Sequence, residues 1–389
     1  MEHIQKPFHI DAALLDAGYW EQALDFALAM IEKNIPAFSE GYPAPASVGN
    51  VYPVIPNTEW TSSFWNGMLW QAYQYTGDEQ YRKAAERTLA DYQNRLEKRI
   101  ETNTHDLGFL YILSCKAEYL LTGNLEAKKT ALEAADLLMV RYNEPAGILQ
   151  AWGDLDNPLE KGRIIVDCLM NIPLLFWASD ETGESHYREA AVRHLKASRT
   201  YLFREDDSTY HTYYFDTETG APLRGTTAQG YSDSSCWARG QAWAIYGLCL
   251  NYRYESDPLL LYDAKRMANY FINRLPEDNV PYWDIVFTSG DEERDSSSAS
   301  IAACALLELA TLLPVVDKDR QVYERVALSM MKSLADSYTS KDEPLSNGIL
   351  LHAVYGKPFG KGVDECTIWG DYFYVEALVR ILRNRPLFW

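Results

Sequence analysis

Residues 76–85 read TGDEQYRKAA and residues 182–191 read TGESHYREAA, so Thr, Gly, an acid, Tyr-Arg and Ala-Ala recur in register. Each copy joins a mostly apolar segment before it to a charged, one-sided segment after it. The glycine can adopt the left-handed conformation that ends a helix. Thr122-Gly123-Asn124 closes a third apolar segment in the same way. This self-similarity predicts repeated helical hairpins.

The hairpin pattern extends to both ends of the chain. An amphipathic helix is predicted from Asp11 to about Lys33. Copies of the hairpin with weaker similarity follow residue 240. Apolar helices are expected near residues 65, 108, 170, 240, 300 and 372, and amphipathic helices near residues 11, 79, 125, 185, 258 and 319. A helix that is apolar on all sides must be buried, and one-sided helices can cover it. We therefore predict an all-α fold, an (α/α)6 barrel with six inner and six outer helices, as a single domain spanning residues 1–389.

The longest connections precede the predicted inner helices, at 35–61, 144–166, 204–237, 277–297 and 340–370. If the inner helices run parallel, these loops gather at one mouth of the barrel. Each loop carries polar and aromatic residues, and loops on a rigid scaffold are where functional sites usually lie. The segment 210–216 (YHTYYFD) is predicted to be a strand, half of a small hairpin beside the mouth.

Composition limits the partners of the chain. The net charge of −19, from 36 basic and 55 acidic residues, repels polyanions, so nucleic acid is not an expected partner. An anionic ligand would have to be small and held by a few local Arg or Lys residues. No stretch approaches eighteen consecutive apolar residues, and the first 30 residues lack the apolar core of a signal peptide, so no membrane association is expected.

The spacing of the cysteines and histidines predicts neither disulfides nor a metal site. The six cysteines, at positions 115, 168, 236, 249, 304 and 366, form no Cys-x-x-Cys pair, which favours reduced thiols in a cytoplasmic protein. The seven histidines are scattered without ligand spacing, so no metal site is predicted, and no cofactor is indicated. The sequence does not predict an oligomeric state.

Two acids stand inside or in front of apolar runs. Asp167 lies within 162–177 (GRIIVDCLMNIPLLFW), and Asp106 stands before the apolar residues 107–113. A buried carboxylate without partners is costly, so such an acid usually pairs or becomes protonated. The alternative for either residue alone is a helix cap or a salt bridge. Equivalent positions at the starts of neighbouring inner helices suggest that the two acids face one site.

A shell of polar and aromatic residues accompanies the two acids. The candidates from the predicted mouth loops and helix starts are Trp60, Trp65, His105, Trp152, His211, Gln229, Trp237, Arg239, Trp243, Lys361, Trp369 and Asp371. Two carboxylates, several tryptophans and a few cations are typical of a carbohydrate site, where indoles stack on sugar faces and acids transfer protons.

Each of these candidates has a structural alternative. Trp65, Trp243 and Trp369 are also suited to the core, and histidines more often satisfy backbone groups than catalyse. An ion pair with Asp233 would account for Arg239, and a cap of the last helix would account for Asp371. The run 295–298 (DSSS) lacks a nucleophile motif and is predicted to start a helix.

Several longer blocks resemble glycoside hydrolase family 88, the unsaturated glucuronyl hydrolases. The resemblance extends from 57–61 (NTEWT) to 367–372 (TIWGDY). Its most specific blocks are 105–111 (HDLGFLY), 150–153 (QAWG), 162–173, 210–212 (YHT), 237–243 (WARGQAW) and 294–299 (RDSSSA). The resemblance implies an (α/α)6 barrel, in agreement with the helix count, and a small anionic oligosaccharide as substrate.

The resemblance also implies a reaction and a set of roles. Such hydrolases release a 4,5-unsaturated uronic acid from the non-reducing end of lyase-generated oligosaccharides by hydrating its vinyl ether. By motif position, Asp167 would be the general acid that also activates water, and Asp106 a second essential carboxylate. Residues that match or accompany the substrate-binding positions are Trp60, His105, Trp152, His211, Gln229, Trp237, Arg239, Trp243, Lys361 and Trp369. A protonated Asp167 near neutral pH requires a raised pKa, which an apolar setting and a second acid would both favour.

The sequence departs from the family pattern at one point, and three alternative functions remain. Relatives that prefer sulfated disaccharides carry serines before the lysine that matches Lys361, and 356–360 (GKPFG) has none, so sulfate preference stays open. The alternatives are a family 105-like unsaturated rhamnogalacturonyl hydrolase, a sugar epimerase and a non-catalytic protein that binds unsaturated oligosaccharides. For the epimerase, only His105 and His211 qualify as pocket histidines.

Overall fold

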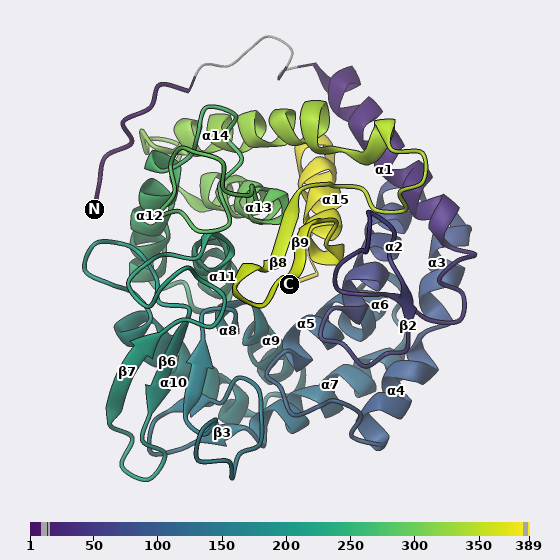
Figure 1. Ribbon diagram of the computed structural model, residues 1–389. Coiled ribbons are helices and arrows are strands. Elements are labelled where there is room, and N and C mark those ends of the chain that lie inside the picture. Colours follow the sequence, from purple (N-terminus) through teal and green to yellow (C-terminus); the bar gives the residue numbers. More distant parts are fainter. Residues whose placement is uncertain (9–13, 15, 384–387) are drawn as a thin grey trace.

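The computed structural model describes residues 1–8, 14, 16–383 and 388–389, which form two concentric rings of helices (Figure 1). The inner ring comprises α2 (Ser62–Thr76), α5 and α6 (Leu107–Tyr111 and Ala117–Thr122), α8 and α9 (Cys168–Asn171 and Pro173–Thr182), α11 (Ala238–Glu255), α13 (Ser296–Leu312) and α15 (Ile368–Arg383). The outer ring comprises α1 (Ala17–Asn34), α3 and α4 (Glu79–Glu86 and Leu89–Glu97), α7 (Leu125–Met139), α10 (Ser185–Tyr201), α12 (Pro258–Asn273) and α14 (Arg320–Ser333). The predicted (α/α)6 barrel is confirmed. Helix α1 begins at Ala17, and the expected start at Asp11 lies outside the described residues.

The Thr-Gly pairs end inner helices in the predicted way. Gly77, Gly123 and Gly183 follow α2, α6 and α9 with φ of 74°, 74° and 77°, the left-handed region that glycine enters without strain. The preceding threonine supports the same turn. The hydroxyl of Thr76, for example, donates to the carbonyl of Ala72 and accepts from the amide of Asp78. The chain therefore reverses at the same end of the barrel after each of these helices.

Burial separates the two rings. In α13 every residue from Ser296 to Leu306 is buried, as expected for a helix enclosed on all sides. In α10 the buried residues, among them Tyr187, Ala191 and Leu195, lie on one face. A π-helical turn, Ile112–Lys116, joins α5 to α6 and is fully buried. A second π-helical turn, Leu334–Tyr338, continues α14. No helix in the described part of the chain has both the length and the apolarity needed to span a membrane.

Short antiparallel strands lie in the connections before the inner helices. They are β1 (Tyr42–Pro43) with β2 (Val54–Ile55), β3 (Tyr142–Asn143) with β4 (Ile148–Leu149), β5 (Arg163–Ile165), β6 (Thr212–Phe215) and β7 (Pro222–Thr226) in one sheet, and β8 (Ala353–Gly356) with β9 (Lys361–Glu365). The strand predicted at 210–216 is confirmed as β6, which pairs with β5 and β7. The β8–β9 hairpin lies over the centre of the ring in Figure 1. Short 3-10 turns occupy Ser340–Asp342 and Lys357–Phe359.

Candidate active site

Asp106 and Asp167 line the same pocket, of about 440 Å³. Its walls come from the segments before α2, α5 and α8, from α4, from the loop that holds Gln229 and from β8. The lining residues are Thr58, Glu59, Trp60, Arg95, Glu101, Asn103, Thr104, Asp106, Trp152, Gly153, Ile165, Asp167, Gln229 and Tyr355. Five residues proposed from the sequence, namely Trp60, Asp106, Trp152, Asp167 and Gln229, are thus brought together.

Asp167 is the more deeply buried of the two acids. It precedes α8, and only 6% of its surface is exposed. Its Oδ1 has no hydrogen-bond partner among the described residues. Burial and, second, the nearby Asp106 carboxylate raise the pKa of Asp167 to about 7, although the positive charge of Arg239 lowers it. The predicted direction of this pKa shift is confirmed, and the group is suited to give and take a proton near neutral pH.

Asp106 is held by hydrogen bonds that Asp167 lacks. Its Oδ2 accepts from the Thr104 hydroxyl at 2.8 Å, and its Oδ1 accepts from Asn171 Nδ2 at 3.2 Å. Burial raises the pKa of Asp106 to about 6, while the bonds from Thr104 and Asn171 and the charge of Arg141 lower it. The Asp106 carboxyl therefore loses its proton more readily than the Asp167 carboxyl.

Two tryptophans form the pocket walls. Trp60 stacks on Trp369 with ring centroids 5.2 Å apart, and its indole nitrogen donates to the Tyr355 hydroxyl at 2.9 Å. Trp152 lies under the guanidinium of Arg163, 4.2 Å from its ring centroid. Both indoles are therefore fixed from behind, which leaves a preorganised apolar wall for a ring-shaped ligand.

His105 and His211 lie behind the pocket surface. Both are nearly fully buried, and burial lowers the pKa of each to about 3, so both rings are neutral. His105 Nε2 lies 3.4 Å from Asp106 Oδ1. His211 Nδ1 lies 2.5 Å from the Thr212 hydroxyl, and its ring packs against Trp237. Neither histidine lines the pocket.

Arg239 connects several parts of the mouth. Its Nη2 donates to Gln229 Oε1 at 2.8 Å and to the Tyr355 carbonyl at 2.6 Å, while its Nη1 donates to the Val354 carbonyl and to Asp295. The alternative of an ion pair with Asp233 is wrong, because the partner is Asp295, 3.3 Å away. The guanidinium also stacks on Trp237 and Trp369. Arg239 therefore orients Gln229 so that its amide nitrogen is left for the pocket.

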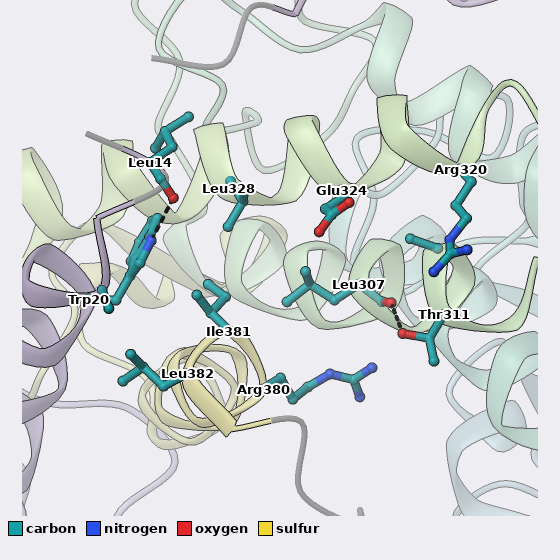
Figure 2. Close-up of a pocket in the computed structure, with 12 residues that line it drawn as sticks. Leu14, Trp20, Leu307, Thr311, Arg320, Glu324, Leu328, Arg380, Ile381 and Leu382 are labelled. Atoms are coloured by element: carbon teal, nitrogen blue, oxygen red, sulfur yellow. Dashed lines mark hydrogen bonds between the residues drawn. The ribbon is translucent and has the colours of Figure 1, made fainter. Parts of the chain in front are cut away.

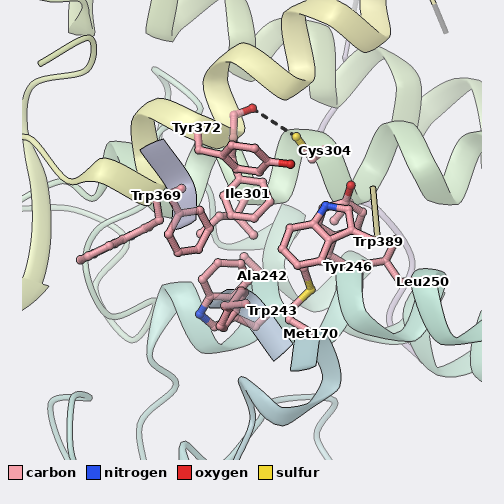
Figure 3. Packing of buried hydrophobic residues seen from close by; sticks show 14 of the residues in the cluster. Met170, Ala242, Trp243, Tyr246, Leu250, Ile301, Cys304, Trp369, Tyr372 and Trp389 are labelled. Carbon is pink, nitrogen blue, oxygen red and sulfur yellow. Dashed lines mark hydrogen bonds between the residues drawn. The ribbon is translucent and has the colours of Figure 1, made fainter. Parts of the chain in front are cut away.

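Other candidates from the sequence lie outside the pocket wall. Trp243 is fully buried between Phe109 and Phe373, and it belongs to the aromatic core (Figure 3). Trp369 and Trp237 are buried behind the wall as well. Trp243 and Trp369 lie within helices and Trp237 lies just before α11, and composition alone does not reveal that these indoles are buried.

The last three candidates, Lys361, Asp371 and Trp65, have different positions. Lys361 is exposed at the rim, and its amine lies 4.4 Å from the ring centroid of Tyr355. Asp371 is enclosed in the core and accepts hydrogen bonds from Tyr52 and from two backbone amides. Trp65 is buried beside a different pocket. Ser296 to Ser298 begin α13 after the cap Asp295, as predicted.

Sequence reasoning missed Thr104, Asn171 and Tyr355. Thr104 and Asn171 bond the Asp106 carboxyl, and Tyr355 lines the pocket from β8. Thr104 and Asn171 stand within four residues of the two acids, and this proximity was the only available signal. Tyr355 lies on β8, far away in sequence, where nothing marks it.

A second pocket of about 430 Å³ lies between α1, α13, α14 and α15 (Figure 2). The carboxyl in its lining is that of Glu324, so it has no acid pair. Within the described residues no group of three His, Cys, Asp or Glu is arranged to hold a metal ion. A buried pair of acids with raised pKa values therefore marks the first pocket as the candidate active site.

Comparisons with known proteins agree with this geometry. A family model described as Glycosyl Hydrolase Family 88 matches residues 47–282. The chain is 46% identical over 391 residues to the unsaturated chondroitin disaccharide hydrolase of Streptococcus agalactiae serotype III (strain NEM316), covering 100% of this chain and 98% of the relative. The crystal structure of unsaturated glucuronyl hydrolase from Streptococcus agalactiae superposes with a TM-score of 0.95 at 45% identity, covering 100% and 98% of the two chains. A mutant of the Streptococcus agalactiae enzyme complexed with dGlcA-GalNAc6S gives a TM-score of 0.86 at 43% identity, with 99% of each chain covered. The chain described here therefore belongs to glycosyl hydrolase family 88.

Proposed function

We propose that this glycoside hydrolase releases a 4,5-unsaturated uronic acid from the non-reducing end of lyase-generated oligosaccharides, with disaccharides of the glycosaminoglycan type as the favoured substrates. The observation that carries the proposal is the pair Asp106 and Asp167, which line one pocket with pKa values raised to about 6 and about 7. A vinyl ether is a weak base at carbon, so its protonation near neutral pH needs an acid of raised pKa.

The roles follow from the two environments. The Asp167 carboxyl transfers its proton to C4 of the unsaturated ring, and positive charge develops at C5 and the ring oxygen. The ionised Asp106 stabilises that charge. Water then adds to C5 and gives its proton to the Asp167 carboxylate, which restores the acid. The hemiketal formed at C5 collapses, the ring opens, and the resulting hemiacetal at C1 releases the aglycone.

Binding roles are assigned to the pocket wall and to the residues behind it. Trp60 and Trp152 would stack on the sugar ring, and the Gln229 amide would donate to its oxygens. His105, His211, Trp237, Arg239 and Trp369 would position these groups from behind. Lys361 at the rim is a candidate for an acidic group on the aglycone, whereas the Lys357 amine is bonded to Glu293.

Two broader assignments accompany the proposal. The relatives are covered over nearly their whole length, and the pocket draws residues from 58 to 355, which supports one catalytic domain over residues 1–389. The six cysteines are buried and unpaired, a state that fits the reducing cytoplasm.

The test is the ultraviolet absorbance of the conjugated double bond. Purified protein is mixed with unsulfated and with 6-sulfated unsaturated chondroitin disaccharide, without added metal. Loss of absorbance with the wild type and its persistence with Asp167→Asn is the expected result, and the ratio of the two rates reports sulfate preference. Binding of the disaccharide by folded wild type with no loss of absorbance would replace the proposal with the non-catalytic alternative.

A further inference from the structure

Asp106 and Asp167 both occupy the N-cap position of a helix, but neither side chain caps its helix. Asp106 is the residue before α5, and Asp167 is the residue before α8, the N-cap position at which an Asp side chain usually accepts a hydrogen bond from a backbone amide of the first turn. Neither side chain makes that bond. The first-turn amides of α5 therefore need another partner, because a buried unpaired amide is costly.

Asn171 supplies the missing cap of α5. It ends α8 and is fully buried, and its Oδ1 accepts from the Phe109 amide at 2.7 Å. Phe109 is the third residue of α5, the usual target of an N-cap side chain. Because a backbone amide can only donate, this bond fixes which end of the Asn171 amide is oxygen.

The other end of Asn171 reaches both acids. Its Nδ2 donates to Asp106 Oδ1 at 3.2 Å and to the backbone carbonyl of Asp167 at 3.1 Å. The two N–H groups and the oxygen of one side chain thus join the starts of α5 and α8. Gly108 permits this close crossing, since a Cβ at that position would lie 2.4 Å from the Asn171 Cα and carbonyl oxygen.

We propose that Asn171 is a positioning residue that caps α5 in place of Asp106, so that the Asp106 carboxylate is not used as a cap and faces the pocket that it shares with Asp167. The proposal deepens the proposed function and rests on it for its catalytic consequence. The groups that face or act on the Asp106 carboxyl are Thr104, His105, Asn171, Arg95, Arg141 and Asp167. Of these, Asn171 is the donor that also contacts the Asp167 segment.

The test replaces Asn171 and compares it with a matched asparagine. Asn171→Ala removes the cap and the donor to Asp106. Asn251→Ala is the control, because Asn251 is equally buried and donates to the Leu169 carbonyl of α8 and to Gly247, but touches neither acid. Thermal unfolding and circular dichroism establish that each variant is folded.

Two readouts separate positioning from structural support. For Asn171→Ala we expect kcat to fall about 10- to 100-fold with a smaller change in KM, since one hydrogen bond to a charged group is lost. The acid limb of the pH profile should move to higher pH, because Asp106 loses a donor that stabilises its ionised form. Asn251→Ala should lose stability while kcat and the acid limb stay at wild-type values. Equal effects of the two variants, or an unmoved acid limb, would overturn the proposal.

A third measurement does not depend on turnover. Carboxyl-carbon NMR titration of Asp106, assigned by the signal that Asp106→Asn removes, should show a higher pKa in Asn171→Ala than in the wild type. An unchanged pKa would overturn the role of Asn171 even if the wild type were inactive, whereas inactivity of the wild type alone would refute only the proposed function. If Asn171→Ala does not fold, Asn171→Leu, which has no donor and no charge, is titrated instead with the same expectation.

Discussion

Asp167 and Asp371 are two buried acids at the starts of inner helices, and burial raises the pKa of each to about 7. Their surroundings differ. Asp371 accepts hydrogen bonds from the Tyr52 hydroxyl at 2.9 Å, the Ile349 amide at 3.0 Å and the Leu350 amide at 2.8 Å. Asp167 lines the pocket and has an oxygen without a partner among the described residues. A raised pKa alone therefore does not distinguish the two acids; a place in the pocket wall and an oxygen without a donor do.

The largest expected effect comes from Asp167→Asn. Loss of the acid and base should lower kcat/KM for the unsaturated disaccharide by about 1,000-fold or more, because the amide neither donates a proton to C4 nor takes one from water. The absorbance assay measures this loss, and circular dichroism checks the fold. Activity within a few-fold of the wild type would remove Asp167 from the reaction and end the contrast with Asp371.

Asp106→Asn tests a second difference between Asp167 and Asp371, namely that Asp167 has a neighbouring acid in the pocket. We expect kcat/KM to fall about 100-fold, since charge stabilisation in the pocket is lost. Removal of the like charge should also lower the pKa of Asp167, so the basic limb of the pH profile should move to lower pH. A basic limb that stays in place would mean that the two carboxyls do not interact.

Asp371→Asn is the reciprocal test. An amide has one oxygen where the carboxyl has two, so at least one buried donor loses its acceptor, and the free energy of unfolding should fall by about 1–3 kcal/mol. Because Asp371 does not line the pocket, kcat/KM of the folded variant should stay within about threefold of the wild type. Chemical denaturation and the absorbance assay give the two values. A large loss of activity at unchanged stability would contradict the division of roles.

The smallest effect concerns stability and pH. The folded-state pKa of Asp167, about 7, lies above the value of the unfolded chain, so the folded protein binds this proton more tightly. The stability that Asp167 contributes is present at low pH and is lost as pH rises toward 7. The unfolding free energy of Asp167→Asn minus that of the wild type should therefore increase by about 1 kcal/mol or more between pH 4 and pH 8. A difference that is flat with pH would place Asp167 in a solvated setting.

Most of the fold could be predicted from the sequence, because each helix is determined by a local pattern of residues. The Thr-Gly pairs at 76–77, 122–123 and 182–183 and the one-sided burial of α10 follow from neighbours in the chain. The site is less accessible to such reasoning, since its contacts join distant segments. Arg239 pairs with Asp295 rather than the nearby Asp233, and Trp60 and Trp243 look alike in sequence although one lines the pocket and the other fills the core.

The orientation of the inner ring has a consequence for how a protein of charge −19 attracts an anion. Helices α2, α5 and α8 each begin within two residues of a pocket-lining side chain, and each of these helical units ends at a left-handed glycine on the far side. Their amino-terminal ends, which carry partial positive charge, therefore converge on the pocket. The backbone therefore adds partial positive charge beside the carboxyl groups of the pocket lining, a contribution to anion binding that the composition conceals.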